Sequence, residues 1–277
     1  MIDLHLHTTA SDGRSTPYEL VNEAASAGLT VMAVTDHDTT ASVQEVLQRA
    51  SGRGIEAIPG IEVTAVEDGR DVHVLGYFLD PADHALGVFL AGQRRARVER
   101  VVAIGERLAA LGMPVDLGLW LNGVRNHSTR SVGRPQVARA MVAAGHVRDT
   151  REAFDKWLGR DGPAFVPRSG PSPEHVIEAI HAAGGLASLA HPGRTKIDAR
   201  IPSLTRAGLD AIEVYHSDHD DAAVERYRAM ARELGLLSTG GSDFHGDPDH
   251  GVTVGAASLP RDEWLRLDAA RHRHAVR

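Results

Sequence analysis

Short apolar or β-branched runs alternate with helical patterns along most of the 277 residues, and this alternation constrains the fold more than any other feature. Runs with strand character cover Ile2–Leu6, Leu29–Thr35, Ile55–Val63, Asp71–Leu79, Leu186–Ala190, Ala211–Tyr215 and Leu236–Thr239. Helical patterns separate most of these runs, at Pro17–Ala27, Ala41–Ala50, Pro173–Ala183, Pro202–Ala207 and Asp220–Leu234. Such a βαβ rhythm is typical of a parallel sheet or barrel, whose active-site residues lie at the carboxyl ends of the strands.

The segment 84–165 interrupts this alternation. It contains a long, Arg-rich helical pattern over His84–Leu111 and shorter ones over Val132–Ala144 and Thr150–Leu158, without strand signals. We therefore expect a helical cap at 84–165, inserted into a barrel formed by 1–83 and 166–277. The insertion holds 13 basic and 7 acidic residues, a balance of +6, whereas the whole chain carries −7. A basic cap would suit an anionic substrate, although a solvated Arg-rich helix is the simpler interpretation of the charge run alone.

Composition excludes several kinds of site and partner. The chain has no cysteine, so disulfides, thiolate metal sites and a cysteine nucleophile are excluded, and any metal must be held by His, Asp and Glu. The excess of acidic over basic side chains, 37 against 30, argues against a protein that coats long duplex nucleic acid. No secretory signal and no run of membrane-spanning length is visible. We expect a cytoplasmic protein with no membrane partner, and the sequence does not indicate its oligomeric state.

Imidazoles and carboxylates follow nearly every expected strand. His5 and His7 alternate on the first strand, so both side chains point to the same side. The other candidates lie on later strands or just after them, at Asp12, His37, Glu62, His73, His191, His216, Asp243 and His245. Because strand ends converge on one face of a barrel, these groups should form one cluster. Imidazole and carboxylate donors suit Mn, Fe or Zn, and their number suits two or three divalent ions. We expect these ions to be Mn²⁺.

One series of motifs runs in order from residue 3 to residue 245: His5-x-His7, Asp12, Thr35-Asp36-His37-Asp38, Gly60-Ile61-Glu62, His73, Ala190-His191-Pro192 and Gly241-Ser242-Asp243-Phe244-His245. The series resembles the motifs of the polymerase and histidinol phosphatase (PHP) family of metal-dependent phosphoesterases. The resemblance implies a distorted (β/α)7 TIM-like barrel with a trinuclear metal site. It also implies three ligand sets, namely His5, His7, Glu62 and Asp243 for one ion, Glu62, His73 and His191 for a second, and Asp12, His37 and His245 for a third.

Further stretches resemble the stand-alone bacterial branch of this family, which includes nucleoside 3′,5′-bisphosphate phosphatases and short-RNA 5′-exonucleases. These stretches are Gly133-Arg134-Pro135, Trp157-Leu158-Gly159, Pro163-Ala164-Phe165-Val166-Pro167 and His191-Pro192-Gly193-Arg194. The resemblance implies hydrolysis of phosphate monoesters of small nucleotides, such as nucleoside 3′,5′-bisphosphates or 5′-monophosphates, or of short oligonucleotides. A metal-bound hydroxide would be the nucleophile.

Outside the metal ligands, we expect substrate to be bound first by Arg134 and Arg194, then by Arg160, with Tyr18 as a weaker candidate. Arg134 lies where a helix should begin, and helix N-termini favour anions. Arg194 follows the expected ligand His191 by three residues. Arg160 stands where the bacterial branch often has a lysine, which keeps the charge but changes the geometry of phosphate binding.

His216 is the expected group for protonating the leaving oxygen or holding the phosphate, since it follows a strand but is not in the ligand series. A structural histidine is the alternative. With Asp243 and His245 it makes up the expected catalytic set. Two carboxylates should orient His37 instead of binding metal: Asp36 and Asp38.

Other functions remain open on sequence grounds. A histidinol-phosphate-type phosphatase belongs to the same family. A metal-dependent amidohydrolase would usually bridge two metals with a lysine, and the first lysine of this chain is Lys156. A non-catalytic module that binds nucleic acid or a polymerase would suit degenerate motifs, whereas these motifs are complete.

Overall fold

The computed structural model describes residues 1–126, 129–247 and 251–274. In these residues seven strands form one sheet in the order β1-β2-β3-β4-β5-β6-β7. Their bounds are β1 (Ile2–Leu6), β2 (Val31–Val34), β3 (Glu56–Glu67), β4 (Arg70–Tyr77), β5 (Leu186–Leu189), β6 (Ala211–His216) and β7 (Leu237–Gly241). Beyond β7 the sheet nearly closes on β1, because the Asp243 N–H donates to the His5 carbonyl oxygen (2.9 Å) and the His7 N–H to that of Phe244 (3.0 Å). The predicted distorted α/β barrel is confirmed.

The strand β4 departs from the expected parallel arrangement. Within the described residues it alone runs antiparallel, pairing with β3 on one side and β5 on the other. The cause is a two-residue turn at Asp68 and Gly69, whose φ angles of 48° and 70° match the twist of a tight β-hairpin. Glu62 therefore lies in the middle of a strand that continues to Glu67, beyond the expected end at Val63.

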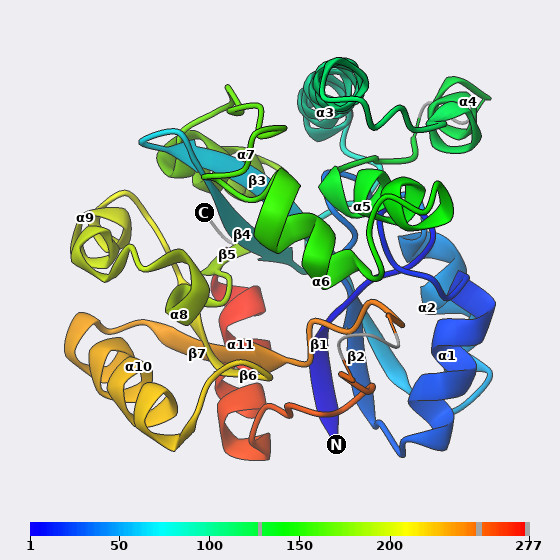
Figure 1. The fold of residues 1–277 in the computed structure, drawn as a ribbon. Coiled ribbons are helices and arrows are strands. Elements are labelled where there is room, and N and C mark those ends of the chain that lie inside the picture. The colour runs from blue at the N-terminus through cyan, green and yellow to red at the C-terminus, as the bar shows by residue number, and fades with distance from the viewer. Residues whose placement is uncertain (127–128, 248–250, 275–277) are drawn as a thin grey trace.

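Helices cover the outside of the barrel (Figure 1). Their bounds are α1 (Pro17–Ser26), α2 (Val43–Ser51), α7 (Pro173–Ala182), α8 (Pro192–Thr195), η2 (Asp198–Arg200), α9 (Ile201–Arg206), α10 (Asp221–Leu234) and α11 (Arg261–His274). Local sequence fixes their ends: Thr16 and Glu19 form a capping box around Pro17, and Gly235 ends α10 in the left-handed region. Three of these elements, α8, η2 and α11, were not predicted.

Alternate side chains of β1 point to opposite faces of the strand, one toward the covering helices and the other into the barrel. Leu6 packs with Leu20 of α1 and Val46 of α2 in one buried cluster outside the barrel. His5 and His7 are fully buried on the opposite face of the strand, inside the barrel. The burial of Leu6 against the helices therefore holds two imidazoles in the interior.

A helical segment lies over one end of the barrel, at the top of Figure 1. It contains α3 (His84–Ala110), α4 (Gly118–Asn126), α5 (Arg134–Ala143), α6 (Thr150–Ala153) and η1 (Phe154–Leu158), and no strand among its described residues. Its helices share their own buried cluster, which includes Ile104, Val137 and Leu158. The exact limits of 84 and 165 for an inserted domain stay a prediction, and α4 was not predicted.

No helix in the described part of the chain combines the length and the apolar character needed to cross a bilayer.

Candidate metal centre

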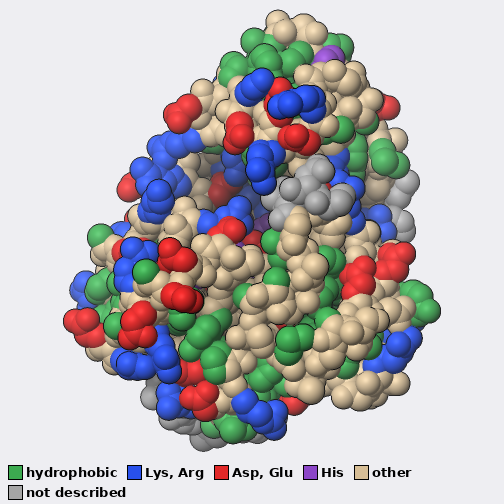
Figure 2. Space-filling view, turned by 60° about the horizontal axis from the view of Figure 1, so that its bottom comes forward, with side chains coloured by type: hydrophobic (Ala, Val, Ile, Leu, Met, Phe, Trp, Pro, Cys, Tyr) green, Lys and Arg blue, Asp and Glu red, His purple; other side chains and the backbone are tan. Residues whose placement is uncertain are grey.

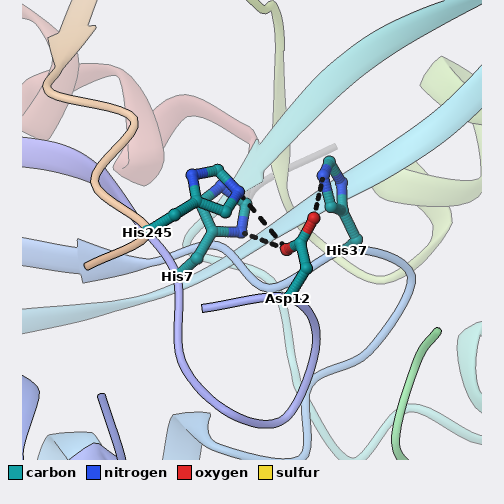
Figure 3. A group of neighbouring side chains, drawn as sticks. All are labelled: His7, Asp12, His37 and His245. Atoms are coloured by element: carbon teal, nitrogen blue, oxygen red, sulfur yellow. Dashed lines mark ion pairs between the residues drawn. The ribbon is translucent and has the colours of Figure 1, made fainter. Parts of the chain in front are cut away.

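The nine predicted metal ligands come together at the end of the barrel below the helical segment. Figure 3 shows four of them turned toward one another, with dashed ion pairs from Asp12 to His7, His37 and His245. His7 and Asp12 lie in the loop after β1, His37 in the loop after β2 and His245 in the loop after β7. Since these segments are far apart in sequence, the closure of the barrel creates the cluster.

Glu62 lies at the centre of the cluster. Its Oε2 is near the ring nitrogens of three histidines, namely His5 Nε2 (3.3 Å), His7 Nε2 (3.2 Å) and His37 Nδ1 (3.0 Å). Its Oε1 is near those of two more, His73 Nδ1 (2.6 Å) and His191 Nε2 (3.1 Å). Glu62 is opposite Leu75 and His73 opposite Thr64, so the hairpin places both on one face. Each Glu62 oxygen can thus serve a different group of imidazoles.

Two further carboxylates also contact histidines of the cluster. Asp243 Oδ1 is 3.3 Å from His5 Nε2 and 3.2 Å from His7 Nε2. Asp12 Oδ1 is 3.3 Å from His245 Nε2, and Asp12 Oδ2 is 3.6 Å from His37 Nε2. The donor atoms of four groups lie close enough together for an ion: His5, His7, Glu62 and Asp243; His7, Asp12, His37 and His245; His37, Glu62 and His73; and His5, Glu213 and His216. Two of the three predicted ligand sets lie within these groups. For the predicted set of Glu62, His73 and His191, the group contains His37 instead of His191, whose Nε2 lies 3.1 Å from Glu62 Oε1.

The donor atoms fit a group of cations because many of them have no hydrogen-bond partner. The buried atoms without one include Nε2 of His5, both ring nitrogens of His7, Nδ1 of His37, His73 and His191, and Oε2 of Glu62. Buried polar atoms in folded proteins are nearly always hydrogen-bonded. So many unpartnered atoms facing one another are therefore best explained as ligands for metal ions.

Two of the imidazoles are neutral in this environment. Burial lowers the pKa of His37 to about 3 and that of His191 to about 4, and their carboxylate neighbours do not compensate. Neutral imidazole is the form that binds a metal ion.

The carboxylates of the cluster, Asp243 and Glu62 among them, favour positive charge on the groups beside them. Burial alone would lower the pKa of His7, but the negative charges of Asp243 and Glu62, each 3.2 Å from its Nε2, outweigh burial and raise that pKa to about 10. Burial would likewise raise the pKa of Asp243, but the neighbouring His5 holds it well below its usual range. The carboxylates that hold a proton on His7 would hold a metal cation in its place.

Glu213 is a functional residue that sequence reasoning missed. It is fully buried on β6, where its Oε1 lies 2.9 Å from His5 Nδ1 and its Oε2 accepts from the His191 N–H at 2.7 Å. A carboxylate on the far nitrogen of a ligating histidine fixes its tautomer and ring orientation. The available signal was one acidic residue within the otherwise apolar run Ala211–Tyr215.

Glu213→Gln is expected to weaken Mn²⁺ binding by about 10–100-fold, because the amide holds His5 and the His191 backbone less firmly than a carboxylate. Titration against a competing chelator measures the affinity. Glu225→Gln, an exposed position on α10, is the matched control and should bind like wild type. If Glu213→Gln and Glu225→Gln bind Mn²⁺ with equal affinity, Glu213 does not contribute to the metal centre.

A cavity of about 700 Å³ opens above the cluster, and Figure 2 shows it as a hollow with charged side chains around it. Its walls carry seven arginines, namely Arg97, Arg100, Arg134, Arg139, Arg151, Arg168 and Arg194. Asp71 links this wall to the cluster: its Oδ2 accepts from Arg100 and Arg134, each at 3.0 Å. Asp71 and His73 share one face of β4, so the arginines stand directly beside the ligands.

The structure separates the predicted substrate residues into two groups. Arg134 and Arg194 line the cavity, and Arg194 Nη1 donates to Asp243 Oδ2 at 3.0 Å. Arg160 is exposed and outside the lining, because the loop after η1 turns its side chain to solvent. Tyr18 is 52% exposed on α1, where its ring lies under Arg49 and away from the cavity.

His216 is buried behind Asp243 and does not line the cavity. Its Nε2 lies 3.5 Å from Asp243 Oδ2, and its Nδ1 accepts from the Asp218 N–H at 3.0 Å. It is therefore placed to support Asp243, and the structure does not bring it to the open side of the cluster.

Asp36 and Asp38 do not contact His37 as expected. Asp36 accepts from the Thr8 N–H (2.8 Å) and from three hydroxyls, those of Thr8, Ser11 and Ser42. Asp38 accepts from Arg97, Arg168 and the Thr64 N–H. These arginines, hydroxyls and backbone N–H groups satisfy both carboxylates in place of His37. Asp36 and Asp38 therefore stabilise the loops around the cluster.

Comparison with known proteins gives a consistent result. The family model described as PHP domain matches residues 3–160. A 3′,5′-nucleoside bisphosphate phosphatase of Chromobacterium violaceum is 35% identical, over 97% of this chain and 96% of the relative. A 5′-3′ exoribonuclease Rnm of Salmonella typhimurium is 36% identical, over 88% of this chain and 84% of the relative.

A solved structure shares the whole architecture. The crystal structure of a protein from Bifidobacterium adolescentis, provisionally named a metal-dependent phosphoesterase, superposes with a TM-score of 0.88 at 33% identity. The superposition covers 98% of this chain and 96% of the Bifidobacterium adolescentis protein.

Proposed function

Because this chain belongs to the PHP domain family, we propose that it hydrolyses phosphate esters of small nucleotides, with nucleoside 3′,5′-bisphosphates and short 5′-phosphorylated oligonucleotides as its substrates. The family predicted from the motifs is confirmed, and the chain is a metal-dependent phosphoesterase. The choice of substrate, the identity and number of the metals, and the roles of individual residues are the parts that we propose.

One observation supports the choice of substrate: a single cavity places the cluster around Glu62 and a wall of arginines side by side. Its floor is the cluster around Glu62, and its wall carries Arg100 and Arg134, joined to that floor through Asp71. A nucleotide with two phosphates could place one on each element. Guanidinium groups suit this role because their paired N–H donors match phosphate oxygens.

Two or three Mn²⁺ ions would be held by the nine ligands, with Glu62 shared between positions. Ions at this cluster would lower the pKa of a water molecule and neutralise the phosphoryl oxygens. The arginine wall would hold the second phosphate and fix the ester in line for attack. His216 would keep Asp243 in position through its Nε2 contact, in place of the leaving-group role that its sequence position suggested.

The alternatives fit the site less well. A histidinol-phosphate-type substrate would leave the arginine wall without a second phosphate. A bridging lysine for amidohydrolase chemistry is lacking, because Lys156 pairs with Glu152 at the surface and the only other lysine, Lys196, is exposed. A binding module without catalysis would not need a complete set of unpartnered donors. We expect this activity to take place in the cytoplasm.

A substrate panel with Mn²⁺ tests the proposal: a nucleoside 3′,5′-bisphosphate, a nucleoside 5′-monophosphate, histidinol phosphate and a short 5′-phosphorylated RNA. We expect kcat/KM for histidinol phosphate to be lower than for the bisphosphate by about 10–100-fold, as for the loss of one charged hydrogen-bonding group. Released phosphate or nucleotide is the measurement, and Asp243→Ala is the inactive control. No turnover of any of the four by folded, metal-loaded protein would overturn the proposal.

A further inference from the structure

A second cavity, of about 600 Å³, lies beside the metal cavity. It is bounded by the loop after β1, by α4, and by α5 with the residues just before it. Nothing in the proposed cleavage of a mononucleotide uses it. Its size falls in the range of small-molecule sites.

The two cavities share part of a wall. Arg139 and Thr150 line both of them. The loop between them is the one that carries the metal ligand Asp12, and the Arg139 guanidinium donates to the Asp12 carbonyl oxygen. The Ser131 N–H also donates to the Ala10 carbonyl oxygen at 2.9 Å, which ties the second cavity to the same loop. A ligand that spans both cavities would therefore pass directly beside the cluster.

The polar groups of the second cavity suit an anion. Among the described residues its lining contains Arg14, Arg130 and Arg139 and no carboxylate. Two buried hydroxyls in the lining have no hydrogen-bond partner: Ser131 Oγ, on a residue 5% exposed, and Thr150 Oγ1, on a residue 4% exposed. Arg139 Nε is also without one. Buried hydroxyls of this kind are normally paired, so they indicate a ligand that supplies acceptors.

The remaining wall is apolar. Trp120 and Val124 of α4 and Val142 of α5 line it, together with Leu119, which is 77% exposed. Any nucleobase can stack on an aromatic side chain, because every base has a π-face. Arginines, buried hydroxyls and a tryptophan together match one nucleotide, with its phosphate, sugar and base.

We propose that this second cavity binds the nucleotide on the far side of the scissile phosphate, so that a short oligonucleotide occupies both cavities and a nucleoside bisphosphate only the first. This inference rests on the proposed function, because it assumes that a phosphate ester is cleaved at the cluster. It makes the second cavity the part of the protein that distinguishes oligonucleotides from mononucleotides.

The kinetic test compares a 5′-phosphorylated dinucleotide with a nucleoside 3′,5′-bisphosphate, each with Mn²⁺. In Arg130→Glu, the ratio of kcat/KM for the dinucleotide to that for the bisphosphate should fall about tenfold or more, mainly through KM. Arg148→Glu is the matched control, an exposed arginine of the same segment outside both cavities, and should keep the wild-type ratio. An unchanged ratio in Arg130→Glu would overturn the second-nucleotide site while leaving the phosphoesterase intact.

A binding measurement separates this inference from the proposed function. With chelator present to prevent hydrolysis, the dinucleotide should quench tryptophan fluorescence in the wild type, and the quenching should be lost in Trp120→Phe. Equal quenching in both proteins would place the base elsewhere and overturn the site. If the wild type cleaves neither substrate, the proposed function fails, while quenching that depends on Trp120 would still support a nucleotide in this cavity.

Discussion

Glu62→Gln is expected to reduce phosphate release by about 10³-fold or more and to lower the metal content of the protein. The carboxylate contacts five imidazoles through its two oxygens, so it is shared by two of the proposed ligand sets. An amide has nearly the same shape but no charge and only one oxygen. Metal ions contribute several kcal/mol to transition-state stabilisation, and each 1.36 kcal/mol corresponds to a factor of ten in rate.

The measurement combines elemental analysis of the purified variant with its rate of phosphate release. Glu67→Gln is the matched control, since Glu67 ends the same strand and pairs with Arg200 at the surface, 2.6 Å from Nε. It should differ from wild type by no more than about twofold, because the partly exposed Glu67–Arg200 pair contacts none of the nine ligands. Wild-type metal content and turnover in Glu62→Gln would contradict the central place given to this residue.

Arg134→Ala is expected to raise KM for a nucleoside 3′,5′-bisphosphate by about 10–100-fold and to leave the metal content unchanged. Arg134 begins α5, lines the cavity and reaches Asp71, but contacts none of the nine ligands. Loss of a charged hydrogen-bonding group costs about 1.5–3 kcal/mol of binding. Asp71 keeps Arg100 as a partner, so the variant should fold.

Arg134→Lys gives a finer test, because lysine keeps the charge but cannot present two parallel donors. Its KM should lie between those of wild type and Arg134→Ala. Arg95→Ala, at an exposed position on α3, provides the control for removal of an arginine from the same helical segment. Loss of metal from Arg134→Ala would give this residue a structural role and contradict its assignment to substrate.

The cluster could be predicted from the sequence because its members follow simple rules. His5 lies on a strand and His7 just beyond its end, two residues on, and His191 and Asp243 follow strands whose carboxyl ends meet in a barrel. Local spacing and the general direction of parallel strands were enough to group them. The motifs then supplied the family, which the comparisons confirmed.

The features that were missed depend on contacts between distant segments. Glu213 matters because β6 brings it against His5, 208 positions away, and no local pattern contains that pairing. Asp38 turned to Arg97 and Arg168 instead of its neighbour His37, because two buried guanidinium groups outcompete an imidazole for a carboxylate. The antiparallel β4 is different, since the Asp68-Gly69 dipeptide is a recognisable hairpin signal that could have been used.

The most direct test of a metal-dependent phosphoesterase centred on Glu62 is a titration of chelator-stripped protein with Mn²⁺, followed by phosphate release from a nucleoside 3′,5′-bisphosphate. We expect no turnover in the stripped protein and a rise in turnover that saturates at two or three equivalents of metal per chain. Full turnover by protein that elemental analysis shows to be free of metal would contradict it.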